Sequence, residues 1–328
     1  MLLLSGEVAP GAPGRAAWFG RLLRLSHLAL EAGRLPHTNA GPLSRREMAA
    51  LGRRNPSMGL MLEGLGPAVD ARHRHAPSKT LEQRLIQIEQ AGRLGIPFTT
   101  GLLLGLGESA AERREALELL ALLQRHWGHI QEVILQPWRP GGAAAGPLAA
   151  HEVDDLLGLI AVARQVLPEE VHLQLPPNLW PPDRLIEALE AGIDDLGGLD
   201  LQDVINPAYP QPGTGALAER LAAAGWRLLP RCACTASGWP ACRGGCSGRR
   251  RRCPSGWGWI VSVRSGVERE ISRERSPRAA GAPALQPDLP DRAGVSGRSS
   301  AQAVSGAAAA DPRSRSGAAA GCGSGPAG

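Results

Sequence analysis

Residues Ile96 to Glu112 read IPFTTGLLLGLGESAAE and decide the fold class. The first nine form an apolar run with two threonines and little alternation, which is typical of a parallel strand buried on both faces. Gly105-Leu106-Gly107 predicts a tight turn, and Ser109 with Glu112 predicts a capping box at a helix start. This strand–turn–helix unit would offer backbone N–H groups to a ligand. The same glycines also fit an ordinary connection that needs positive φ.

Strand and helix patterns alternate at least six times along the chain. Such alternation predicts a parallel sheet with right-handed crossovers. A dinucleotide-binding sheet would carry its glycine fingerprint after the first strand and an acid about 20 residues later, and neither is present. We therefore expect an α/β partial (β/α) barrel. Its strands are predicted at 2–4, 34–37, 57–62, 96–104, 131–136 and 171–175, and its helices at 16–32, from 44, 81–94, 110–127, 151–166, 183–191 and 215–224.

Polar residues or glycines follow each predicted strand. In a barrel, the carboxyl ends of the strands form the face on which sites are built. These residues are Gly6-Glu7, His37-Thr38-Asn39, Glu63, Gly105 to Glu108, Gln136, Asn178 and Asp194 to Gly198.

The net charge of +5 is unevenly distributed along the chain. Residues 231–328 carry +9, so residues 1–230 carry −4, which argues against nucleic-acid binding by the folded part. No run of eighteen apolar residues predicts a membrane span, and the first residues lack the basic region of a signal peptide. A cytoplasmic protein is the expectation.

Composition changes near Arg231, where hydrophobic periodicity gives way to Gly, Ser, Arg and Ala. We therefore expect a barrel domain over 1–230 and a low-complexity tail over 231–328. The tail fits either disorder or a shift of reading frame after Arg231. All six cysteines lie in it, at positions 232, 234, 242, 246, 253 and 322.

Eight segments, in this order, resemble the first subunit of FO synthase, the 7,8-didemethyl-8-hydroxy-5-deazariboflavin synthase family of radical S-adenosylmethionine enzymes. The resemblance covers about residues 2–230. The segments are LLLSGEVAPG, LPHTNAGPLS, NPSMGLMLE, RHAPSKT, IPFTTGLLLGLGES, GHIQEVILQPWRP, LQLPPNL and LEAGIDDLGG.

The resemblance implies a partial barrel that holds a 4Fe-4S cluster and cleaves S-adenosylmethionine to a 5′-deoxyadenosyl radical. The implied substrate is an adduct of tyrosine and a ribityl-diaminouracil, supplied by a second subunit. Ring closure with loss of ammonia would then give the deazaflavin chromophore. The protein's own share would be placement, orientation and exclusion of water.

Site residues carry over position by position. Ser5, Gly6 and Glu7 match the group that holds the methionine amino end of the cofactor, where a carboxylate suits an ammonium. Glu63 matches a polar contact to the ribose, and it could equally be a helix-start acid. Contacts to the adenine are implied for Gly101, Gly105, Gly107 and Glu108.

Substrate contacts are implied for His37, Asn39, Gln136 and Asn178, although Gln136 and Asn178 also fit plain hydrogen-bonding roles in loops. His73 and His75 fall in a loop that could close over the site. The remaining histidines, His126, His129, His151 and His172, are expected at the surface or at helix ends. No histidine spacing predicts a metal site.

One departure from the family pattern concerns the cluster. The family's C-x3-C-x2-C precedes the first matching segment and is absent from this chain, so the first βα unit is expected to be missing. Cys242-x3-Cys246-x6-Cys253 has the wrong second spacing. Because three thiolates hold such a cluster, we expect the chain as written to be inactive. Alternatives are a sister radical enzyme of menaquinone-type synthesis, a cluster-free barrel lyase that binds a phosphorylated ligand at Gly105 to Ser109, and a non-catalytic remnant.

Overall fold

The computed structural model describes residues 1–141, 146–197, 199, 203, 205–230, 234 and 259–260. The chain divides into two compact units, Met1–Glu270 and Ile271–Gly328, and the second contains no described residue. The predictions of disorder or of a shifted reading frame after Arg231 therefore fall almost wholly outside the described residues.

Six parallel strands form one sheet in the order of the sequence. They are β1 (Leu2–Leu4), β2 (His37–Asn39), β3 (Ser57–Gly59), β4 (Phe98–Leu104), β5 (Ile130–Pro137) and β6 (His172–Gln174). A separate antiparallel pair joins β7 (Leu229–Pro230) to β8 (Trp259–Ile260).

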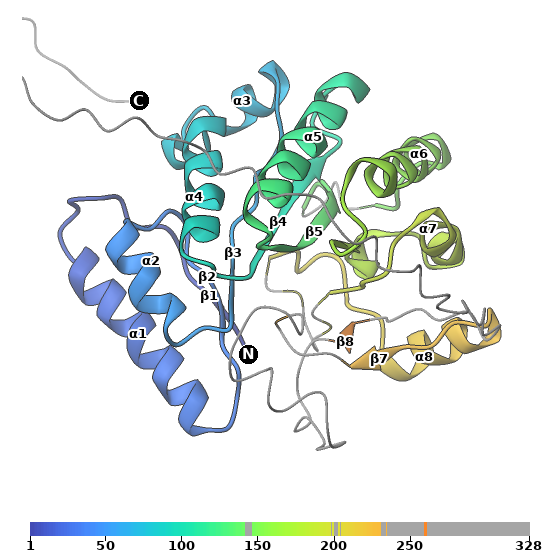
Figure 1. Cartoon of the computed structure of the whole chain (residues 1–328). Helices are drawn as coiled ribbons and strands as arrows, with labels where there is room; N and C mark the ends of the chain where they lie inside the picture. The colour runs from blue at the N-terminus through green and yellow to red at the C-terminus, as the bar shows by residue number, and fades with distance from the viewer. Residues whose placement is uncertain are drawn as a thin grey trace, which may run out of the picture. The chain divides into compact units, whose positions relative to one another are not determined.

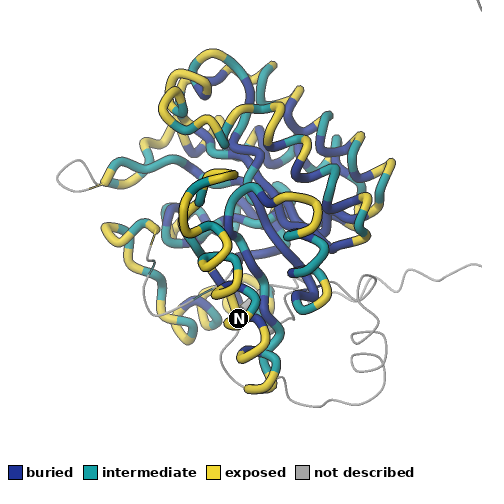
Figure 2. The backbone as a smooth tube through the Cα atoms, turned by 90° about the vertical axis from the view of Figure 1, so that its left-hand side faces the viewer, coloured by how far each residue is buried: buried dark blue, intermediate teal, exposed yellow. Residues whose placement is uncertain are grey.

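Helices connect the strands and cover the outer face of the sheet, as Figure 1 shows for α4, α5 and α6. Their bounds are α1 (Arg15–Glu31), α2 (Arg45–Gly52), α3 (Pro67–His73), α4 (Leu81–Arg93), α5 (Ala110–Trp127), α6 (Ala150–Val166), α7 (Leu185–Ala191) and α8 (Thr214–Ala223), with short 3-10 turns η1 (Pro77–Lys79), η3 (Pro177–Leu179) and η4 (Pro182–Arg184). The strands are the most buried part of the backbone (Figure 2). The predicted α/β partial barrel is confirmed.

The two faces of the sheet differ in chemistry, because successive side chains of a strand point to opposite sides. Met58, Leu102 and Leu135 are buried in the core together with side chains from α4, α5 and α6. On the opposite face, Thr99 Oγ1 donates to Glu132 Oε2 at 2.9 Å. The pairing of β4 with β5 shifts register at this point. One face therefore holds the helices, and the other carries buried polar groups.

Several local predictions are confirmed and others are wrong. Both capping boxes, Ser44 with Glu47 and Ser109 with Glu112, are present. The second strand begins at His37 instead of ending there, so Thr38 and Asn39 belong to it rather than to a polar loop. The third strand ends at Gly59 rather than residue 62.

One further prediction fails because long-range packing decides the outcome. The loop expected to carry His73 contains α3, and His73 ends that helix. His129, expected at the surface or at a helix end, follows the end of α5 and is buried there, just before β5 begins. In the described part of the chain, no helix is both long and apolar enough to cross a membrane.

Candidate functional site

Two predicted carboxylates, Glu7 and Glu63, flank one buried guanidinium at the carboxyl edge of the sheet. Arg84 Nη2 lies 3.0 Å from Glu7 Oε1 and 3.8 Å from Glu63 Oε1. The Arg84 side chain is 2% exposed and that of Glu63 is 8% exposed, whereas Glu7 is 33% exposed. The guanidinium Nε is buried and has no hydrogen-bond partner among the residues that the structure describes. Glu7 is therefore the open end of the cluster, and Glu63 is its closed end.

Two consecutive residues of the η1 turn also contact these two carboxylates. Ser78 Oγ donates to Glu7 Oε2, and Lys79 Nζ lies 2.8 Å from Glu63 Oε1. Thr80 then caps α4, the helix that carries Arg84. The segment PSKT, followed by one turn of helix, thus brings a hydroxyl, an ammonium and a guanidinium to one place.

The backbone of Glu63 has φ 77°, a conformation that residues other than glycine rarely adopt. Its N–H donates to the carbonyl of Gly101 at 3.1 Å, and its own carbonyl accepts from Leu103 at 2.7 Å. These bonds to β4 fix the residue directly beyond β3. Such strain persists only where the surroundings enforce it, and it is concentrated at functional sites.

His73 adds a neutral imidazole to the closed end. Its Nε2 lies 3.6 Å from Glu63 Oε2 and has no hydrogen-bond partner within the described part of the chain. Burial lowers the pKa of His73, and the positive charges of Lys79 and Arg84 act in the same direction, against the opposing effect of Glu63. The imidazole is therefore uncharged near neutral pH.

The glycine turn after β4 does not present bare N–H groups, contrary to the expectation from its sequence. The N–H groups of Gly105 and Leu106 both donate to the Glu108 carboxylate at 2.7 Å. Arg113 Nε donates to Glu108 Oε1 at 2.8 Å. An anion bound at these N–H groups would have to displace the chain's own carboxylate, so the turn offers little to a phosphorylated ligand.

Gly101 has a packing reason to be glycine. A Cβ at this position would lie 2.9 Å from the backbone nitrogen of Ile134 and closer still to its carbonyl oxygen. The residue therefore permits the close approach of β4 to β5 just before the turn that carries Gly105 and Gly107.

The remaining predicted residues separate into two groups. Ser5 accepts from Trp18 Nε1 at 2.7 Å, and its N–H donates to the carbonyl of Asn39 at 3.1 Å, so Ser5 and Asn39 lie with Glu7 at the carboxyl ends of β1 and β2. His37 begins β2, where its Nδ1 lies 2.7 Å from Ser57 Oγ, and its Nε2 lies beside Gly59, the last residue of β3. The contact of His37 with substrate stays a prediction.

Gln136 and Asn178 lie beyond the cluster along the same edge. Gln136 is half-buried near the end of β5, next to Leu103 in register. Asn178 Nδ2 donates to Asp203 Oδ2 at 2.8 Å and to the carbonyl of Tyr209 at 3.1 Å, which ties down the loop before α8. The Nδ2 of Asn178 thus makes hydrogen bonds of the kind expected in a loop, while its buried Oδ1 has no hydrogen-bond partner among the described residues, and its contact with substrate stays a prediction.

The residues that sequence reasoning missed are Ser78, Lys79 and Arg84. Ser78 and Lys79 belong to RHAPSKT, one of the segments that carry the family resemblance. Lys79 is the one lysine among 36 basic residues, which was itself a signal. Arg84 belongs to an amphipathic helix pattern, and nothing local predicts that its guanidinium is buried.

Comparison with known proteins places the chain in a family. A protein of Synechococcus elongatus named 7,8-didemethyl-8-hydroxy-5-deazariboflavin synthase is 54% identical over 233 residues, which are 70% of this chain and 69% of the relative. Proteins of the same name from Thermosynechococcus vestitus and Gloeobacter violaceus are 52% and 53% identical, and the matches cover 74% and 72% of those relatives. No family model matches the chain.

A solved structure supports the fold. The FeFe-hydrogenase maturase HydG from Carboxydothermus hydrogenoformans superposes with a TM-score of 0.50 at 16% identity, over 67% of this chain and 54% of that one. The chain thus spans about half of that structure, and the likeness concerns architecture alone. On the sequence identities, the chain belongs to the 7,8-didemethyl-8-hydroxy-5-deazariboflavin synthase family.

Proposed function

We propose that the chain serves in forming the deazaflavin chromophore from an adduct of tyrosine and a ribityl-diaminouracil, as a carbon–nitrogen lyase that releases ammonia. A second subunit would supply the adduct. The observation that carries the proposal is the pair of carboxylates, Glu7 and Glu63, held around the buried guanidinium of Arg84 at the carboxyl edge.

The residues present fit S-adenosylmethionine. Its amino-acid end is a zwitterion, and the open end of the cluster offers the partly exposed carboxylate of Glu7 to an ammonium. Among the described residues Arg84 Nε has no hydrogen-bond partner, and a guanidinium suits the adjacent carboxylate of the same ligand. Glu63 would accept from the ribose hydroxyls. Gly101, Gly105 and Gly107 would line the adenine, with Glu108 keeping their turn in place.

The residues present do not fit the cluster. Residues 1–230 contain no cysteine, and the described residues include no group of three or more His, Cys, Asp or Glu arranged to hold a metal ion. The chain's own residues would bind the amino-acid, ribose and adenine parts of the cofactor and orient them against the substrate.

Equilibrium dialysis of the full chain with S-adenosylmethionine tests the proposal. We expect binding that weakens about 10- to 100-fold in Glu7→Gln and in Glu63→Gln, because each change removes a charge-assisted hydrogen bond. Glu89→Gln is the matched control, since Glu89 pairs with Arg93 on the exposed face of the α4 helix. Absence of binding by the unaltered chain, or equal affinity in all variants, would overturn the proposal.

A further inference from the structure

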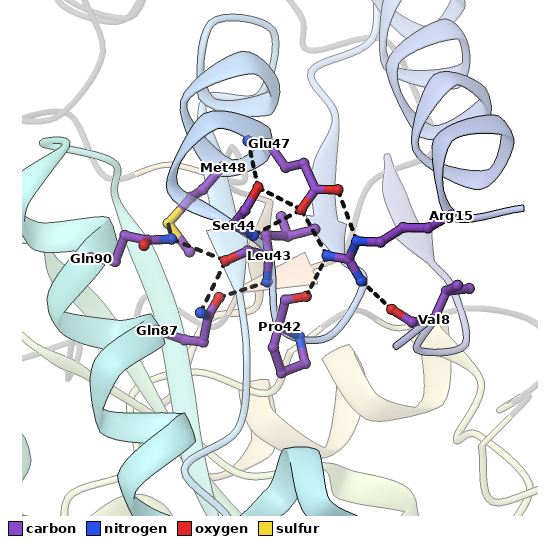
Figure 3. Close-up of polar contacts among 9 residues, drawn as sticks. All are labelled: Val8, Arg15, Pro42, Leu43, Ser44, Glu47, Met48, Gln87 and Gln90. Atoms are coloured by element: carbon purple, nitrogen blue, oxygen red, sulfur yellow. Dashed lines mark hydrogen bonds and ion pairs between the residues drawn. The ribbon is translucent and has the colours of Figure 1, made fainter. Parts of the chain in front are cut away.

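Arg15, the first residue of α1, connects two loops of the site that are far apart in sequence. Its guanidinium donates to the carbonyl of Val8 and, at 3.2 Å, to the carbonyl of Pro42. The same guanidinium donates two hydrogen bonds, of 3.0 and 2.7 Å, to the carboxylate of Glu47 (Figure 3). Val8 directly follows Glu7, and Pro42 directly follows Gly41.

The loop that contains Pro42 is also held from its other side. The N–H of Leu43 donates to Gln87 Oε1 at 2.8 Å, and the carbonyl of Leu43 accepts from Gln87 at 3.0 Å and from Gln90 at 3.2 Å (Figure 3). Ser44 caps α2 immediately afterwards. Side chains from α1, α2 and α4 therefore fix this loop, so its backbone has little freedom to shift.

Gly41 lies against the side chain of Glu7. A Cβ at Gly41 would be 2.8 Å from Glu7 Cδ and closer still to Cγ, and the backbone has φ +74°. Glu7 thus crosses the bare α-carbon of Gly41 on its way to Arg84 and Ser78. Because the backbone of the Gly41 loop has little freedom to shift, the position of the Glu7 carboxylate depends on how closely the two loops are held together.

We propose that Arg15 is a positioning residue of the cofactor site, which clamps the loops of Glu7 and Gly41 together and so sets where the Glu7 carboxylate meets its ligand. This inference rests on the proposed function for the identity of that ligand, an amino-acid ammonium. A planar guanidinium with several donors reaches two carbonyls and a carboxylate at once. The single ammonium of a lysine does not.

The first experiment measures S-adenosylmethionine dissociation constants for the full chain and four variants. Arg15→Met and Gly41→Ala should each raise the constant at least about tenfold, the effect of losing one charge-assisted bond. Arg93→Met and Gly33→Ala should not, because Arg93 is an exposed ion-pair residue on α4 and Gly33 has the same positive φ, +70°, with open space around it. Equal effects in Gly41→Ala and Gly33→Ala would overturn the proposal.

A second, ligand-free experiment separates this inference from the proposed function. Urea unfolding of Glu7→Gln, Arg84→Met and the double variant gives the coupling between Glu7 and Arg84. The coupling should fall at least by half when the cycle is repeated in the Arg15→Met background. An unchanged coupling would overturn the inference even if the cofactor binds, and a reduced coupling would support it even if it does not. Should Arg15→Met not fold, Glu47→Gln, which weakens the grip on Arg15, serves in its place with the same expected direction.

Discussion

Acidification should destabilise the protein through His129. The residue is 6% exposed, and its Nε2 donates to the carbonyl of Ile88 at 2.8 Å. Its buried Nδ1 has no hydrogen-bond partner among the described residues. Burial lowers the pKa of His129 to about 4, although the bond to Ile88 acts in the opposite direction. Protonation would place a second N–H where none of the described residues accepts a hydrogen bond from it.

The sign and size follow from proton linkage. The unfolded chain, in which the histidine pKa is 6.5, binds a proton that the folded chain does not bind between pH 6.5 and about pH 4. This contribution is therefore fully present above that window and is lost as the pH falls through it. At 1.36 kcal/mol per pKa unit, the complete loss is about 3 kcal/mol, of which about 2 kcal/mol is reached at pH 5.

Urea unfolding followed by circular dichroism at pH 7.5 and pH 5.0 provides the assay. His129→Gln keeps an N–H donor for Ile88 but does not titrate, and His126→Gln removes an exposed histidine three residues earlier. The loss of stability between the two pH values should be smaller in His129→Gln by about 2 kcal/mol and unchanged in His126→Gln. The reasoning is refuted if His129→Gln and the unaltered chain lose the same free energy.

Four other outcomes are expected. Gly158→Ala, in the exposed middle of α6 with open space around it, should raise the free energy of unfolding by about 0.5–1 kcal/mol. Gly101→Ala should lower the free energy of unfolding by more than about 2 kcal/mol, since the added methyl meets the backbone of Ile134. Glu108→Gln should lower the free energy of unfolding by about 1–3 kcal/mol, because its bonds to Gly105, Leu106 and Arg113 become weaker. Glu118→Gln, at an exposed ion pair on a helix, should change the free energy of unfolding by less than about 0.5 kcal/mol. Equal losses for the two variants in thermal unfolding would contradict the role given to Glu108. Anaerobic reconstitution with iron and sulfide should leave the 328-residue chain without a cluster, and about four irons per chain with cleavage of S-adenosylmethionine would show that other residues hold it.

The sequence predicted most reliably what neighbouring residues decide. The capping boxes at Ser44 and Ser109 depend on four consecutive residues and are present. The long strand before Gly105 was equally clear, because β4 is buried along nearly its whole length and its sequence is therefore a nearly continuous apolar run. The second strand was misplaced because its three residues, His37 to Asn39, are polar at both ends and pair between two neighbours.

The site was predicted only where a motif and a strand end coincide. Glu7 and Glu63 follow strands and could be named, but their partner Arg84 is 77 residues beyond Glu7 and its burial is a tertiary event. The occupied N–H groups of the glycine turn could not be foreseen either. Glu108 lies next to the turn, and the sequence does not say whether its carboxylate folds back or points away.

Lys79 makes the site accessible to selective chemical labelling. It is the one lysine of the chain, so besides the α-amino group its ε-amine is the only primary amine that an acylating reagent can modify. It is 31% exposed and lies 2.8 Å from Glu63. A ligand that covers this carboxylate should shield the amine, and one that draws Glu63 away should uncover it. The extent of labelling of Lys79, measured by mass spectrometry, thus reports whether the site is occupied in the unaltered protein.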